Sequence, residues 1–196
     1  MRKLLCGFLA GIVLRGIMMF TADVRGADEK AVAKPTIAVI PKGTTHSFWK
    51  SIHAGALKAA AEFGAEVIWQ GPTKEDDRNM QIQVVQNFIS RKAAAIVLAP
   101  LDDRALVNPV KTAVERGIKV IIIDSDLNSD VHSSFVATDN FVGGKLCEKR
   151  LAEVLGGKGK VILLRYMEGS ASTSNREKGF LEGMKEHGAG IEIVSS

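Results

Sequence analysis

Two adjacent aromatic rings and an acidic residue are the side chains of this sequence whose chemistry is clearest. Phe48 and Trp49 follow a loop of hydroxyl-bearing residues that also contains His46. Aromatic rings pack on the C–H faces of a pyranose or furanose ring as well as on protein side chains, so we expect one ring in the core and at least one against a ligand. Asp124 follows an isoleucine-rich run, where its carboxylate can accept two ligand hydroxyls or cap a helix or turn.

Two basic residues stand at comparable points of the sequence. Lys42 directly follows the first apolar run, where it is either a ligand contact or a solvated loop charge. Arg176 follows Asn175 at the end of a stretch rich in serine and threonine. At the amino end of a helix, its guanidinium favours an oxygen-rich or anionic group, and the alternative is a surface salt bridge.

Catalytic and metal-binding patterns are poor. Ser47 and Lys50 match Ser-x-x-Lys, but no Ser-Asp-Asn or Lys-Thr-Gly triplet accompanies them, so we attribute the match to chance. The sequence has no Walker loop and no Gly-x-Ser-x-Gly motif, and no Gly-x-Gly-x-x-Gly follows the first apolar run. The four histidines lack metal-ligand spacing with each other or with Cys147, which we expect to be a buried small hydrophobe. We therefore expect no enzyme, no cofactor and no metal site.

Alternating apolar runs and amphipathic stretches must position these side chains. Short β-branched runs predict strands, and the stretches between them predict helices. Such alternation requires right-handed crossovers and a parallel sheet, in which ligands bind beyond the carboxyl ends of the strands. The predicted strands are 36–41, 66–70, 94–99, 119–124, 134–138, 160–164 and 191–194.

Capping residues and apolar spacing predict where the helices begin and which faces they bury. Ser47 is expected to cap the first helix, Thr73 with Asp76 resembles a capping box for the second, and Asp139 is expected to cap the fourth. The expected buried positions are Ile52, Ala56, Ala59, Ala60 and Phe63 in the first helix, Val84, Val85, Phe88 and Ile89 in the second, Cys147, Leu151 and Leu155 in the fourth, and Phe180, Leu181 and Met184 in the fifth.

Composition and charge define a globular chain. Of its 196 residues, 46% are hydrophobic and 24% charged. The net charge of +4 comes mostly from the first 26 residues, which carry four basic residues and one acidic residue. The remainder has a charge of +1, so nothing resembles a basic patch for nucleic acid.

The amino-terminal residues have the pattern of a secretory signal peptide. Arg2 and Lys3 precede an apolar run of 11 residues over 4–14, which is too short to span a membrane. Val24 and Gly26 suit a cleavage site, so we expect residues 1–26 to be removed, the alternative being an uncleaved anchor. Residues 27–35 are expected to be a short polar leader. After cleavage one cysteine remains, and no internal disulfide is possible.

Four segments, in order, resemble the type I periplasmic sugar-binding proteins of ABC transporters, the class of the ribose-binding proteins. They are TIAVIPKGTTHSFWKSIHAGALKAA (36–60), VIIIDSD (120–126), FVATDNFVGG (135–144) and GSASTSNREKGF (169–180). The resemblance spans 36–196. It implies two Rossmann-like α/β lobes in the periplasm that close on one small carbohydrate-like ligand and deliver it to an inner-membrane ABC permease.

The resemblance also implies where the lobes and the ligand lie. The N-terminal lobe would cover 36–138, with the first hinge crossing at Thr138 and Asp139. Residues 139–196 would form the start of the C-terminal lobe, which would be incomplete because members of the family are longer than this chain. We therefore expect this chain alone to bind sugar weakly or not at all. The rings of Phe48 and Trp49 would stack on the sugar. The expected ligand-binding residues are Lys42, His46, Phe48, Trp49, Asp124, Ser125, Asn175 and Arg176.

The identity of the ligand stays open. Many ribose-type relatives have Asp-Arg where this chain has Asp124 and Ser125, which argues against simple ribose. The segments 40–42, 70–76 and 124–126 resemble the branch that binds rhamnose or furanosyl autoinducer signals, but that branch does not usually have arginine at 176. The alternatives in function are the sensing domain of a receptor and the effector domain of a LacI-like regulator.

Overall fold

The described residues alternate strand and helix, as predicted. The computed structural model describes residues 33–196, so the predicted signal peptide and most of the predicted leader lie outside the described residues. Every predicted strand is present, and its ends differ from the prediction by at most one or two residues. The strands are β1 (Thr36–Ile40), β2 (Glu66–Trp69), β3 (Ala95–Leu98), β4 (Lys119–Ile123), β5 (Ser134–Val136), β6 (Gly159–Ile162) and β7 (Ile191–Ser195).

All strand pairs are parallel, which confirms the predicted α/β fold. A five-stranded sheet has the order β2-β1-β3-β4-β5, and β6 pairs with β7 in a second sheet. We call residues 33–136 the N-terminal part and residues 140–196 the C-terminal part. The helices of the two parts together are α1 (Ser47–Phe63), α2 (Arg78–Ser90), α3 (Val107–Glu115), α4 (Asn140–Val154) and α5 (Ala171–His187).

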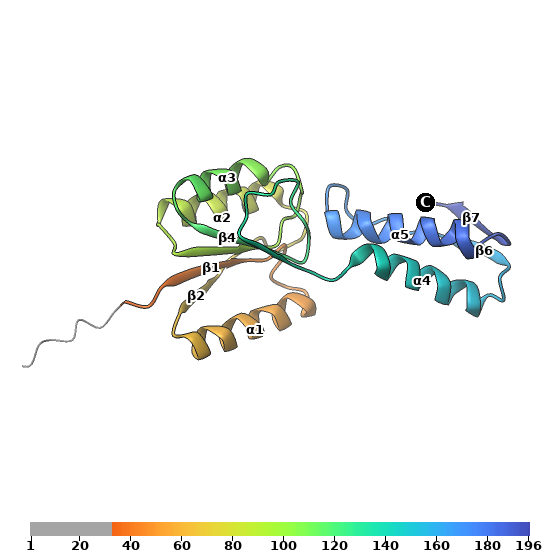
Figure 1. Ribbon diagram of the computed structural model, residues 1–196, viewed down its shortest axis with the longest axis horizontal. Coiled ribbons are helices and arrows are strands. Elements are labelled where there is room, and N and C mark those ends of the chain that lie inside the picture. Colours follow the sequence, from red (N-terminus) through yellow and green to blue (C-terminus); the bar gives the residue numbers. More distant parts are fainter. Residues whose placement is uncertain (1–32) are drawn as a thin grey trace, which may run out of the picture. The chain divides into compact units, whose positions relative to one another are not determined.

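The core of the N-terminal part lies between the five-stranded sheet and two helices. Figure 1 shows α2 and α3 on one face of this sheet and α1 on the other. The predicted buried face of α2 is confirmed, since Val84, Val85, Phe88 and Ile89 are all buried there. Each such side chain contributes about 1.5–3 kcal/mol by leaving water. The core also contains Ala38, Ile40, Ile96, Leu98, Leu106, Val110, Val120 and Ile122.

Two predicted helix starts are wrong. The cap of α1 is His46 and not Ser47, because the ring Nδ1 of His46 accepts a hydrogen bond from the amide of Phe48 at 3.2 Å. The second helix begins after the predicted capping box at 73–76, and Asp77 is its cap. The loop before it stays out of the helix, where Glu75 accepts a hydrogen bond from the first helix.

The apolar face predicted for α1 is only partly buried: Ile52, Ala56 and Ala60 are half-buried, whereas Ala59 and Phe63 are exposed. Trp49 is the one buried residue of this helix, whereas Phe63 is 82% exposed and Leu57 is 50% exposed. The spacing correctly predicts an amphipathic helix. Its end near Phe63 is the most exposed part of the stripe.

The helix pair α4 and α5 is packed through small residues, which corrects the predicted faces. Cys147 is exposed, and Leu181 is 36% exposed, although Phe180 is buried as predicted. A Cβ added to Gly179 would overlap the carbonyl oxygen of Phe141, so the two backbones are in contact there. The close approach of the two backbones therefore requires glycine at the contact points. The buried residues of α4 are Asn140, Gly144, Glu148 and Ala152.

The predicted cap of α4 is confirmed, because Asp139 accepts a hydrogen bond from the amide of Val142 at 2.9 Å. We expect Asp139→Ala to lower the free energy of unfolding by about 1 kcal/mol, as for other N-caps. Urea denaturation measures this change. Asp130→Ala, in an exposed loop, is the control, and equal midpoints for the two variants would contradict the assignment.

No helix between residues 33 and 196 combines the length and the apolar character that crossing a membrane requires.

Candidate functional site

A cavity of about 650 Å³ lies beyond the carboxyl ends of β1 and β4, where the parallel sheet predicts a ligand site. Pockets for small molecules are usually roughly 300–1,000 Å³. Residues of both parts line it, including the loop that precedes α5. Of the eight predicted site residues, the structure brings six together around this cavity: Lys42, His46, Phe48, Trp49, Asp124 and Arg176.

The other two predicted residues lie elsewhere. Ser125 is fully buried, and its hydroxyl accepts a hydrogen bond from the amide of Ser172 at 2.9 Å. Asn175 lines a separate hollow of about 310 Å³ beside residues 137–141. Neither lines the main cavity, so their direct contact with a ligand stays a prediction.

The adjacent aromatic residues occupy different environments. Trp49 is 2% exposed, and its indole Nε1 donates to Oε1 of Glu75 at 2.7 Å. Phe48 is 46% exposed and packs edge to face on Trp49, with 4.9 Å between the ring centroids. Trp49 is therefore an anchor of the loop, and Phe48 has a ring free to stack on a ligand.

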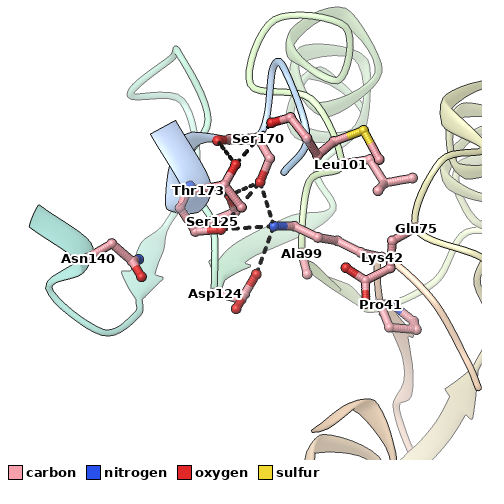
Figure 2. A network of polar contacts seen from close by, with 12 residues as sticks. Pro41, Lys42, Glu75, Ala99, Leu101, Asp124, Ser125, Asn140, Ser170 and Thr173 are labelled. Carbon is pink, nitrogen blue, oxygen red and sulfur yellow. Dashed lines mark hydrogen bonds and ion pairs between the residues drawn. The ribbon is translucent and has the colours of Figure 1, made fainter. Parts of the chain in front are cut away.

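A buried ammonium group stands at the centre of the polar contacts shown in Figure 2. Lys42 is 4% exposed, and its Nζ lies 2.9 Å from Oδ2 of Asp124. The same Nζ donates to the hydroxyls of Ser170 at 3.0 Å and Ser172 at 3.2 Å. These three partners match the three protons of the ammonium group. The burial of a charge is tolerated here because it is both paired and hydrogen-bonded.

The backbone at Asp124 is strained. This residue directly follows β4 and has a φ of 64°, in the left-handed region. A non-glycine residue there costs roughly 1–2 kcal/mol, and aspartate is one of the residue types that tolerate it best. The conformation presents the carboxylate to Lys42 at the carboxyl end of the sheet. Strain of this kind is concentrated at functional sites.

Gln81 is a positioning residue that the sequence reasoning missed. Its side chain is fully buried; Nε2 donates to the carbonyl oxygens of Pro41 at 3.0 Å and Ala99 at 2.8 Å. Its Oε1 accepts from the amide of Leu101 at 2.8 Å. One amide thus joins the loops after β1 and β3. A polar residue inside the apolar stripe of a predicted helix was the signal that could have revealed it.

The cavity is lined by three basic side chains, Lys42, Arg165 and Arg176, and by three acidic ones, Glu75, Asp124 and Glu177. Lys42 pairs with Asp124, and Arg165 pairs with Glu177 at 2.9 Å. Arg176 is exposed and lines the cavity from α5.

Tyr166 also lines the cavity and was not predicted. Desolvation raises its pKa, and the nearby carboxylates of Glu75 and Asp76 raise it further. The phenol is therefore protonated at neutral pH and can donate a hydrogen bond. Among the residues from 33 onward, no group of three histidine, cysteine or carboxylate side chains could hold a metal ion.

A parallel α/β sheet whose strand ends open on a cavity is an arrangement typical of proteins that bind small molecules. A family model described as "Periplasmic binding protein domain" matches residues 37–196. The chain therefore belongs to the periplasmic binding protein family, and the predicted resemblance is confirmed.

Relatives of this chain bear the names of sugar-binding proteins. It is 30% identical over 195 residues to a D-ribose/D-allose-binding protein of Pseudomonas aeruginosa. The match covers 95% of this chain and 60% of that relative. A solute-binding protein of Agrobacterium radiobacter in complex with D-arabinose is 34% identical with a TM-score of 0.81, covering 84% of this chain and 57% of the other.

A second solved structure, an Agrobacterium vitis solute-binding protein with bound D-fucose, is 37% identical with a TM-score of 0.77. The match covers 81% of this chain and 56% of that protein. The chain thus spans between half and two thirds of the length of these relatives.

Proposed function

We propose that this chain is the periplasmic solute-binding component of an ABC importer and that its ligand is a sugar or a sugar-like molecule. The observation that carries this proposal is the cavity at the strand ends, which combines the half-exposed ring of Phe48 with the carboxylate of Asp124. Family membership supports it, as do the sugar names of the relatives. The names of these relatives favour import over the regulator and receptor alternatives.

The proposed site chemistry follows from the geometry. Phe48 stacks on the C–H face of the sugar, and the carboxylate of Asp124 accepts a ligand hydroxyl with the oxygen that does not face Lys42. Arg176 donates to a ring or hydroxyl oxygen from the opposite side. Because the basic and acidic side chains that line the cavity are equal in number, the site suits a neutral ligand.

The proposed mechanism is closure of two lobes. The lobes correspond to 36–138 and 139–196, and the chain crosses between them at Thr138 and Asp139. Ligand contacts from both lobes shift an open–closed equilibrium toward the closed form, which a membrane permease then recognises. Export with removal of residues 1–26 places the protein in the periplasm. Members of this family are binding proteins and not enzymes, and we propose that the bound sugar is released unchanged.

A thermal-shift screen of the full-length gene product against pentoses, hexoses, deoxysugars and inositols tests the proposal. A bound ligand stabilises the folded state by mass action, so the cognate sugar raises the Tm in a concentration-dependent way. The absence of any shift across all four groups would count against sugar binding.

Phe48→Ala is expected to weaken binding of the cognate sugar by about tenfold, because the loss of a stacked aromatic ring costs roughly 0.5–1.5 kcal/mol beyond its buried area. Calorimetric titration of the full-length gene product measures the change in Kd. Phe63→Ala is the matched control, since Phe63 lies at the other end of the same helix and is 82% exposed. Equal affinities for the two variants would remove Phe48 from the site.

A further inference from the structure

The N-terminal and C-terminal parts are joined by hydrogen bonds around the loop that precedes α5. Besides the two bonds from Lys42, the amide of Ser172 donates to the hydroxyl of Ser125 at 2.9 Å. The amide of Asp103 donates to the carbonyl oxygen of Gly169 at 2.9 Å. The residues that follow β1, β3 and β4 therefore all bond to the start of the C-terminal helix α5.

Burial makes the lysine bonds the costly ones to lose. Lys42 is 4% exposed, and its serine partners Ser170 and Ser172 are 2% and 5% exposed. Separation of the two parts would leave the ammonium group with one protein partner, Asp124, and would return the serine hydroxyls to water. The lysine bonds are shielded from water while the two parts are in contact, and a shielded hydrogen bond is stronger than an exposed one. Both lysine bonds cross the same contact, so separation of the two parts breaks them together.

The cavity exists beside these bonds while they are made. About 650 Å³ remains between the same loops, with Lys42, Ser170 and Ser172 in its wall and the ring of Phe48 facing it. A ligand does not have to break the lysine bonds in order to enter. The bonds are therefore compatible with an open cavity beside them.

We propose that Lys42, Ser170 and Ser172 form an interlobe latch, which keeps the two parts together in the absence of ligand. The latch uses contacts within the protein for a task that bound ligand otherwise performs. The latch also raises the affinity for sugar, an inference that rests on the proposed function. The apparent Kd is the intrinsic Kd divided by the fraction of molecules in the binding-competent form, and the latch increases that fraction.

The test measures ligand-free protein first. The double variant Ser170→Ala/Ser172→Ala removes both lobe-crossing hydroxyls but keeps the Lys42–Asp124 pair, so the ammonium group retains its charged partner. Lys42→Met is the second variant. The matched controls are Ser90→Ala, whose hydroxyl bonds to its own helix α2, and Lys111→Met, an exposed lysine in α3.

Hydrogen–deuterium exchange reports the opening directly. The amides of Asp103 and of position 172 are protected by partners across the contact, and neither partner is altered by the variants. We expect their exchange to accelerate at least tenfold in both latch variants, while exchange in β3 is unchanged. Small-angle X-ray scattering should show a larger radius of gyration. Exchange at these amides equal to that of the controls would overturn the latch.

A ligand titration separates this inference from the proposed function. If the full-length gene product binds a sugar, the double variant should bind it several-fold more weakly, and an equal or tighter Kd would mean that the bonds do not favour the binding-competent form. If no sugar binds but the variants open, the latch stands and the proposed function fails. If sugar binds and the variants do not open, the function stands and the latch fails.

Discussion

Gln81→Leu is expected to lower the free energy of unfolding by about 3–5 kcal/mol, because three buried backbone groups lose their hydrogen-bond partner at once. These are the carbonyl oxygens of Pro41 and Ala99 and the amide of Leu101, all within 3.0 Å of the glutamine side chain. Leucine has a similar size but cannot bond to any of them. Chemical denaturation followed by circular dichroism measures the loss.

The same substitution should also weaken the site. Lys42 directly follows Pro41, so a loop released from Gln81 carries the ammonium group away from Asp124. Gln83→Ala is the matched control, since Gln83 is exposed on the same helix; its expected change in stability is about 0.5 kcal/mol or less. A Gln81→Leu protein as stable as this control would show that the amide does not hold the two loops.

Gly144→Ala is expected to lower the free energy of unfolding by about 3 kcal/mol, through overpacking of the α4–α5 pair. A Cβ at this position would overlap the carbonyl oxygen of Arg176 and lie 2.8 Å from the amide nitrogen of Phe180. Backbone atoms cannot move aside as a flexible side chain does, so the two helices must separate. Thermal unfolding followed by the circular dichroism of the helices should show a lower Tm for this variant.

The neighbouring Gly143 provides an unusually close control. A Cβ added there meets nothing within 4 Å, and alanine is about 1 kcal/mol more favourable than glycine inside a helix. Gly143→Ala should therefore leave stability unchanged or raise it. If both variants lost the same stability, the cause would be a general intolerance of α4 to substitution and not the close approach to α5.

The order and type of the elements follow from the sequence. Strands β1, β3 and β4 are short apolar runs with buried residues, and the sequence shows such runs without any knowledge of the neighbouring strands. The apolar stripe of α2 predicts its buried face, since Val84, Val85 and Phe88 recur at helical spacing. Because ligands collect at the carboxyl ends of parallel strands, the same pattern also places Lys42 and Asp124 at the candidate site.

The helix faces and caps depend on what each helix meets. Spacing predicts Cys147 as buried, yet the approach of α5 favours Gly144 and Glu148 at the interface and leaves Cys147 exposed. Glu148 fits there because Gly183 has no side chain: a Cβ would lie 2.5 Å from its carboxylate. Such matches between distant residues are not visible in local periodicity.

By itself, the sequence determined an α/β chain with parallel strands and chemically distinctive residues at their carboxyl ends, since these depend on local spacing and alternation. Only the tertiary structure decided which of those residues share one cavity, and that Lys42 is satisfied by Asp124 together with Ser170 and Ser172. The physical reason is distance along the chain: Lys42 lies 128 residues before Ser170, and no local pattern encodes a hydrogen bond over that separation.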